Sequence, residues 1–138
     1  MADDRTIEYS KTVSESDVYL FAGITGDFSP VHVDAVRMAS SAVGERVAHG
    51  VLVTGLMSAA SSRWVDRFYP DDILLSYGYD RIRYIRPVRF GDTITVRVSF
   101  AEERPEKAQI VCNIEATSQD GVVVGAAVHL LSYGHADV

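Results

Sequence analysis

The sequence predicts an α+β fold in which an antiparallel sheet of about five strands wraps around one long, apolar central helix. Apolar residues recur at helical spacing in the first half, whereas the second half, after about Asp71, is rich in alternating Val, Ile, Thr and Tyr. Short breaks separate the strands, and such connections make neighbours antiparallel. With 138 residues, 47% of them hydrophobic, the chain has the size and composition of one globular domain spanning residues 1–138.

The N-terminal part is predicted to hold a short strand and a short helix. Thr6–Val13 has the composition of a strand. Ser14, followed by acidic residues, is typical of a helix N-cap, so we expect a helix over Ser16–Ala22. The glycine-rich stretch Gly23–Pro30 then predicts a turn.

Two further helices follow this turn. Ser29 is a good N-cap and Pro30 suits the first helical position, so the second helix is expected to run to about Ala42 and to end at Gly44. The third helix is expected over Gly50–Phe68. It is apolar around most of its circumference, which is typical of a buried helix.

The remaining chain is predicted to form four strands. They are expected over Ile73–Ile85, Thr93–Glu103, Ala108–Thr117 and Val122–Tyr133. The first of the four is long, so we expect a bend or bulge near Gly78. An open sheet has edges to protect, and a dimer that joins two sheets edge to edge would remove one edge per subunit.

Charge and composition exclude several classes of function. The net charge of −6 argues against nucleic acid binding, which usually shows a basic excess. Cys112 is the single cysteine, so neither an intramolecular disulfide nor a cysteine-rich metal site is expected. The longest apolar stretch, Val51–Ala60, is too short to span a membrane, and the acidic N-terminus lacks the pattern of a secretory signal. We therefore expect a cytoplasmic protein that binds neither nucleic acid nor membranes.

Asp27 and His32 are the residues that suggest chemistry. Pro30 lies between them, so Asp27 is expected in the loop and His32 in the first turn of the next helix. A carboxylate beside a neutral imidazole is an acid–base pair that could hold a water molecule. The alternative is that Asp27 makes turn hydrogen bonds and His32 packs at the helix start. A metal site using His32 with Asp34 and His49 lacks recognisable ligand spacing.

Gly50, directly after His49, begins the buried helix. The first N–H groups of a helix have no partner within it, and they stabilise negative charge if they are accessible. Glycine there would let a reacting group approach the backbone closely. The alternative is that glycine only fits a tight start to the helix.

Three segments together resemble the MaoC-like, (R)-specific enoyl-CoA hydratase branch of the hot-dog fold. They are FAGITGDFSPVH at residues 21–32, HG at 49–50 and RYIRPVRFGDT at 83–93. The resemblance covers nearly the whole chain, and the segment from Asp27 to His32 is its most specific part. Ser29 departs from the family pattern, which usually has Asn there; both residues are good N-caps.

The resemblance implies a fold, an activity and a set of site residues. The fold would be the hot-dog fold, and the activity the reversible addition of water to a trans-2-enoyl-CoA, giving the (R)-3-hydroxyacyl-CoA. Asp27 and His32 would activate the water, the Gly50 N–H would polarise the thioester carbonyl, and Ser58 would be a supporting serine. The coenzyme A thioester is the substrate, no cofactor is implied, and a homodimer or dimer-based oligomer is expected.

Other functions and site residues stay open from the sequence. A hydratase of branched or dicarboxylic enoyl-CoA, a hot-dog thioesterase and a non-catalytic acyl-CoA-binding protein are the alternatives. An arginine cluster could bind coenzyme A phosphates or form a solvated face; it consists of Arg81, Arg83, Arg86 and Arg89. Three tyrosines could line an acyl pocket or pack in the sheet: Tyr77, Tyr79 and Tyr84. His129 and His135 belong to no recognisable catalytic or metal-binding motif in the sequence.

Overall fold

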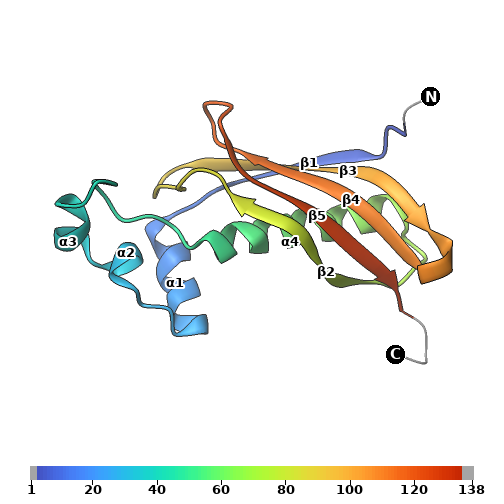
Figure 1. The fold of residues 1–138 in the computed structure, drawn as a ribbon, viewed down its shortest axis with the longest axis horizontal. Coiled ribbons are helices and arrows are strands. Elements are labelled where there is room, and N and C mark those ends of the chain that lie inside the picture. Colours follow the sequence, from blue (N-terminus) through green and yellow to red (C-terminus); the bar gives the residue numbers. More distant parts are fainter. Residues whose placement is uncertain (1–2, 135–138) are drawn as a thin grey trace.

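A curved sheet wraps around the long helix α4 in the computed structural model, which describes residues 3–134 (Figure 1). The sheet has five strands in the order β1-β3-β4-β5-β2, and all neighbours are antiparallel. The strands are β1 (Thr6–Thr12), β2 (Leu74–Tyr84), β3 (Thr93–Arg104), β4 (Gln109–Thr117) and β5 (Val123–Tyr133). The helices are α1 (Glu15–Thr25), α2 (Pro30–Val33), α3 (Ala35–Ala39), α4 (Gly50–Phe68) and the short 3-10 helix η1 (Pro105–Lys107). The expected architecture is therefore confirmed.

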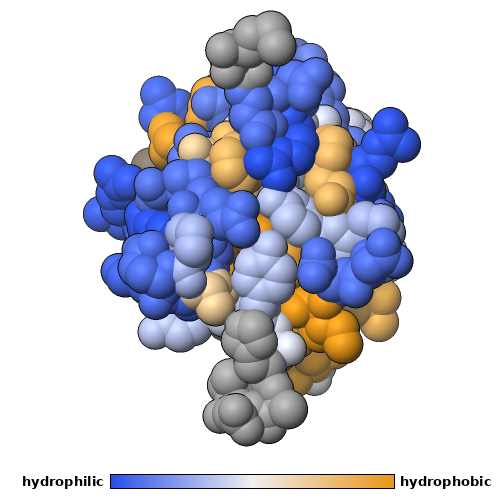
Figure 2. Space-filling view, turned by 90° about the vertical axis from the view of Figure 1, so that its right-hand side faces the viewer, coloured by the Kyte–Doolittle hydropathy of each residue, from blue (hydrophilic) through white to orange (hydrophobic). Residues whose placement is uncertain are grey.

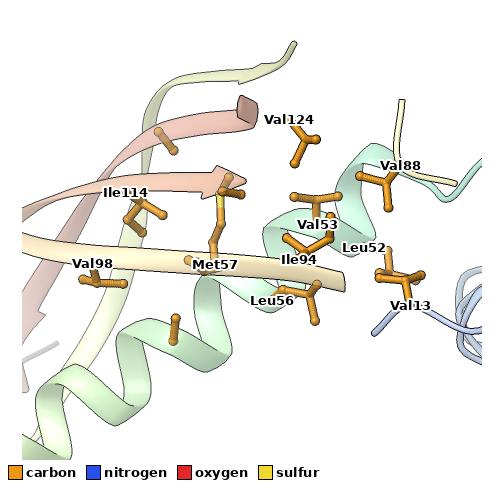
Figure 3. Packing of buried hydrophobic residues seen from close by; sticks show 14 of the residues in the cluster. Val13, Leu52, Val53, Leu56, Met57, Val88, Ile94, Val98, Ile114 and Val124 are labelled. Atoms are coloured by element: carbon orange, nitrogen blue, oxygen red, sulfur yellow. The ribbon is translucent and has the colours of Figure 1, made fainter. Parts of the chain in front are cut away.

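The hydrophobic core lies between α4 and the concave face of the sheet (Figure 3). Side chains of α4 such as Val53 and Met57 meet strand residues such as Ile94 and Ile114 there. Burying one such side chain stabilises the fold by roughly 1.5–3 kcal/mol. Cys112 is a free, buried thiol in this core, and burial raises its pKa to about 12, as expected for an inert residue.

The three short helices gather at one end of the sheet (Figure 1). Ser14 caps α1 in a capping box with Asp17, as the sequence indicates. The helix runs to Thr25 rather than Ala22, because the left-handed residue that ends it is Gly26 (φ +79°), not Gly23.

The second predicted helix, from Pro30 to Ala42, is wrong as one element. The chain leaves helical geometry at Asp34 (φ −104°, ψ 92°), which divides α2 from α3. The Asp34 carboxylate accepts a hydrogen bond from the Arg37 N–H and so caps α3. The Asp34 side chain thus forms a local hydrogen bond with the backbone, which favours the start of a new helix over continuation of the previous one.

Strand β2 is irregular and lies at one edge of the sheet. Its pairing with β5 shifts register between Ser76 and Gly78, which confirms the bend expected near Gly78, and again between Asp80 and Arg83. Arg81 has a positive φ of 51° within the second shift. The alternation that would put Arg81 and Arg83 on one face of the sheet is therefore interrupted between them.

The two sheet edges differ in polarity. The exposed positions of β1 are polar, whereas the start of β2 and the residue before it expose Ile73, Leu75 and Tyr77. The second half of β2 also exposes charged residues, Asp80, Arg81 and Arg83. Figure 2 shows the end of the molecule where β1 begins and β5 ends; this face is largely hydrophilic, with an apolar area at the lower right of the view. Among residues 3–134, no helix has the length and apolar character needed to cross a membrane.

Candidate active site

Asp27 is held in a short loop between α1 and α2. Gly26 ends α1 in the left-handed conformation, and the Asp27 N–H donates to the Thr25 hydroxyl (3.2 Å). The Asp27 carboxylate accepts a hydrogen bond from the Ser29 N–H at 3.3 Å through Oδ1. Ser29 occupies the N-cap position of α2, as expected, but its side chain makes no capping hydrogen bond. The Asp27 side chain is 54% exposed. Its other oxygen, Oδ2, lies 4.0 Å from Nε2 of His32.

His32 lies in α2 with its ring orientation fixed by one hydrogen bond. Nδ1 lies 2.7 Å from the Val47 carbonyl oxygen. A carbonyl oxygen only accepts, so Nδ1 carries a proton and, in the neutral ring, Nε2 holds the lone pair. That Nε2 faces Asp27 Oδ2 at 4.0 Å, too far for a direct hydrogen bond. Two acceptors at this separation suit a bridging water molecule.

The Val47 carbonyl is itself held in place by distant parts of the chain. Val47 pairs with Arg89 in an isolated β-bridge, and the Ala48 N–H donates to the Val88 carbonyl at 2.8 Å. The Val47 N–H donates to the Val31 carbonyl at 3.1 Å. The segment before α4 thus joins α2 to the turn between β2 and β3, and His32 takes its orientation from that connection.

His49 contacts both Asp27 and His32. Its ring is buried and stacks on His32 with ring centroids 3.7 Å apart and 25° between the planes. Its Nε2 lies 2.9 Å from the Asp27 carbonyl oxygen and 4.0 Å from Asp27 Oδ2. Nε2 therefore carries the proton, while the buried Nδ1 has no hydrogen-bond partner in the part of the chain described. The sequence pointed to His49 as the residue before the helix, but not to this role.

Gly50 is the first residue of α4, and it borders two pockets. One, of about 200 Å³, also contacts Asp27, His32 and His49. The other, of about 270 Å³, is lined by Tyr84 and Arg86 among others. A Cβ atom at Gly50 would lie 2.5 Å from the Tyr84 ring, so only glycine fits there without movement of Tyr84. The Gly50 N–H belongs to the first turn, whose amides have no partner within the helix.

The structure brings together three of the four predicted site residues. Asp27, His32 and Gly50 share one pocket. Ser58 lies eight residues further along α4, about 12 Å at the helical rise, and lines a different pocket. Sequence reasoning missed His129, which lines that second pocket, because its partners come from distant segments.

A metal centre would need convergent ligand atoms, and this arrangement lacks them. Asp34 caps α3, so Asp27 rather than Asp34 joins the two histidines, with candidate ligand atoms within 4.8 Å of one another. The two imidazole planes are 25° apart and their centroids are separated by 3.7 Å, however, so one metal ion cannot lie in both ring planes at roughly 2.1 Å from a nitrogen of each. The proton on His49 Nε2 is also engaged with the Asp27 carbonyl. The three residues do not fit a metal ion.

The four arginines of the predicted cluster do not act alike. Arg89 pairs with Glu45, and Arg83 donates to the Ile82 carbonyl. Arg86 is the one of the four that lines a pocket bordered by Gly50. The three tyrosines also diverge: Tyr84 lines that pocket, Tyr79 packs on His129, and Tyr77 is exposed.

Comparisons with known proteins match this arrangement to one family. The family model described as MaoC like domain matches residues 2–122. An (R)-specific enoyl-CoA hydratase of Rhodospirillum rubrum is 33% identical over 122 residues, covering 88% of this chain and 81% of that protein. A 3-hydroxybutyryl-CoA dehydratase of Methylorubrum extorquens is 36% identical over 104 residues, or 74% of this chain and 63% of that protein. The unliganded R-hydratase of Pseudomonas aeruginosa superposes with a TM-score of 0.80 at 31% identity, covering 94% of this chain and 80% of that one.

Proposed function

Because this chain belongs to the MaoC-like domain family and has the hot-dog fold of its hydro-lyases, we propose that it hydrates a trans-2-enoyl-CoA reversibly to the (R)-3-hydroxyacyl-CoA. The (R) hand of the product rests on the likeness to the Rhodospirillum rubrum hydratase. The observation that carries the proposal is the pair of acceptors, Asp27 Oδ2 and His32 Nε2, 4.0 Å apart beside the start of α4. We propose that this chemistry uses only the thioester substrate and water, without a cofactor.

The pair supplies acid–base chemistry for the addition. A water molecule between Asp27 and His32 donates its hydrogens to Oδ2 and Nε2, which directs an oxygen lone pair at C3 of the enoyl group. As the C3–O bond forms, one water proton passes to the pair and the C2–C3 π electrons move toward the thioester carbonyl. A proton then passes from the pair to C2, so one water is added in total. The two groups act as one coupled acid–base unit.

Gly50 stabilises the negative charge that develops on the thioester oxygen. Its N–H at the start of α4 polarises the carbonyl and stabilises the enolate. Removing one such donor typically lowers the rate on the order of 10²–10³-fold. Arg86, in the wall of the neighbouring pocket, is the arginine we propose for contact with the phosphates of coenzyme A.

We also propose that the protein works as a dimer joined through β2. An antiparallel pairing of two β2 strands would extend the sheet and remove the apolar edge. The polar β1 edge, with Lys11 at its end, is the less suitable surface.

The proposal is tested by the absorbance of the enoyl thioester on mixing the protein with crotonyl-CoA. The native protein should cause this absorbance to fall, and Asp27→Asn should abolish the reaction. The asparagine Oδ1 can still accept a hydrogen bond from the Ser29 N–H, so the variant should keep the conformation of the loop. Asp71→Asn, at an exposed acid outside the pocket, is the matched control and should retain activity. Full activity in Asp27→Asn would refute the mechanism. Release of free thiol, followed with a thiol-reactive dye, would instead identify a thioesterase.

A further inference from the structure

We propose that a second pocket along α4 binds an uncharged hydroxyl or carbonyl oxygen carried by the acyl chain of the substrate. This inference rests on the proposed hydration of an enoyl-CoA and names the class of acyl group that it takes. The pocket, called the distal pocket below, measures about 150 Å³. Its polar lining consists of Ser58, Ser61, Ser62, Asp66, Ser76 and His129.

His129 forms the buried centre of the distal pocket. It is 1% exposed and comes from β5, and its two ring nitrogens each contact a serine hydroxyl at 2.8 Å: Nδ1 contacts Ser61 and Nε2 contacts Ser76. A neutral imidazole donates at one nitrogen and accepts at the other, so one serine donates to the ring and the other accepts from it. Both hydroxyls keep unused hydrogen-bonding capacity, which a ligand oxygen can meet.

Tyr79 adds a hydroxyl group without a partner next to this centre. Its ring stacks on His129 with 4.1 Å between centroids and 6° between planes. The Tyr79 hydroxyl is buried and has no hydrogen-bond partner within residues 3–134. Burial raises the pKa of Tyr79. A buried hydroxyl without a partner is unfavourable, and here it belongs to the residue that stacks on His129, the ring that lines the distal pocket.

The charges around the distal pocket select a neutral group. No lysine or arginine lines it, and Asp66 contributes a carboxyl group. Burial lowers the pKa of His129 to about 4, so its ring stays neutral at physiological pH. A carboxylate at the end of the acyl chain would therefore meet no cation there, which disfavours a dicarboxylic substrate.

The distal pocket lies where an acyl chain bound at Gly50 would extend. Thr54 and Ser58 follow Gly50 at intervals of four residues and so lie on the same face of α4. Along this face the Thr54 hydroxyl contacts the Tyr84 hydroxyl at 2.7 Å, and Ser58 then reaches the distal pocket about 12 Å from Gly50. We therefore place the acyl chain along this face of α4, running from the thioester position at Gly50 toward His129.

The test compares enoyl-CoA substrates in matched pairs. Each pair has one chain length, with and without a terminal hydroxyl group, and a terminal carboxylate forms the third member. At the length that reaches the distal pocket, kcat/KM should be about tenfold higher with the hydroxyl group, which equals about 1.4 kcal/mol, and lowest with the carboxylate. Equal values for the hydroxylated and unsubstituted chains at every length, with crotonyl-CoA hydrated, would overturn this inference alone. No hydration of any enoyl-CoA would overturn the proposed function.

Two variants show whether the preference arises at His129. Ser61→Ala should bring the ratio of the paired kcat/KM values close to one, and His129→Leu should reverse it in favour of the unsubstituted chain. Ser132→Ala, on the same strand as His129 but on the opposite face, is the matched control and should keep the native ratio. If His129→Leu does not fold, Ser61→Ala decides the matter, and an unchanged ratio in that variant would refute the assignment.

Discussion

The imidazole rings of His32 and His49 stack 3.7 Å apart, and each Nε2 lies 4.0 Å from the same oxygen of Asp27. Only His32 presents a lone pair to that oxygen, because Nε2 of His49 donates to the Asp27 carbonyl. The two histidines therefore have different tasks. His32 takes part in proton transfer, whereas His49 positions the loop and the other ring.

Replacing His49 tests this positioning role. His49→Phe keeps an aromatic ring for stacking but leaves the Asp27 carbonyl without its donor. We expect kcat for crotonyl-CoA to fall at least about tenfold with KM little changed, since the acid–base geometry loosens while the substrate contacts remain. His49→Gln, which can donate to the same carbonyl, should recover part of kcat. Equal kcat in His49→Phe and the native protein would contradict the assignment.

The contact between Gly50 and Tyr84 predicts a non-additive pair of substitutions. Gly50→Ala should lower the free energy of unfolding by about 1–3 kcal/mol, because the added Cβ meets the Tyr84 ring at 2.5 Å. In a Tyr84→Ala background this clash is absent, and Ala has the higher helix propensity of the two residues. Gly50→Ala should then be neutral or stabilising. Urea denaturation of the four proteins measures the coupling, and additive effects would argue against the contact.

The buried ring of His129 predicts a loss of stability in mild acid. Its pKa is about 4 in the folded protein and near 6.5 when unfolded, so between these values the unfolded state binds more protons. The stabilisation is complete above pH 6.5 and is lost as the pH falls toward 4, by about 3 kcal/mol in total. His129→Leu should show a flatter dependence over this window. An equal slope in both proteins would show that other groups cause the effect.

The β2 edge predicts the effect of a charge on assembly. Leu75 is 56% exposed on this edge, and Leu75→Lys should convert the proposed dimer to a monomer, because an edge lysine opposes strand pairing. Light scattering after size-exclusion chromatography measures the mass. Val36→Lys, at an exposed apolar residue of α3, serves as the control and should leave the mass unchanged. A dimer that survives Leu75→Lys would move the interface elsewhere.

The sequence predicts best those elements whose signals are local. Helix α4 has the expected bounds because its apolar pattern and its flanking residues agree along its whole length. The helix predicted from Pro30 to Ala42 fails at Asp34, where a side chain caps the next turn instead of continuing the helix. The Arg81 conformation at the β2 bulge likewise has no local signal, since neither glycine nor asparagine marks it.

The candidate site was predictable to the extent that one motif contains it. Asp27 and His32 lie within a single segment, so their proximity follows from a turn. His129 has partners 68 and 53 residues away in the chain, and only the fold brings Ser61 and Ser76 to its two nitrogens. The proximity of Tyr84 to Gly50 also could not be predicted from a local motif, because it depends on how β2 is placed relative to α4.

From the bridge between Val47 and Arg89 we expect the acid–base pair to be completed late in folding. Helix α4 and the hairpins can form from nearby residues, but the Val47 carbonyl reaches its place only when the long loop from Val47 to Arg89 closes. Until then His32 has no partner to fix its tautomer. On refolding, ellipticity should therefore return before hydration does, and a delay that does not depend on protein concentration would belong to the closure of this loop rather than to dimer assembly.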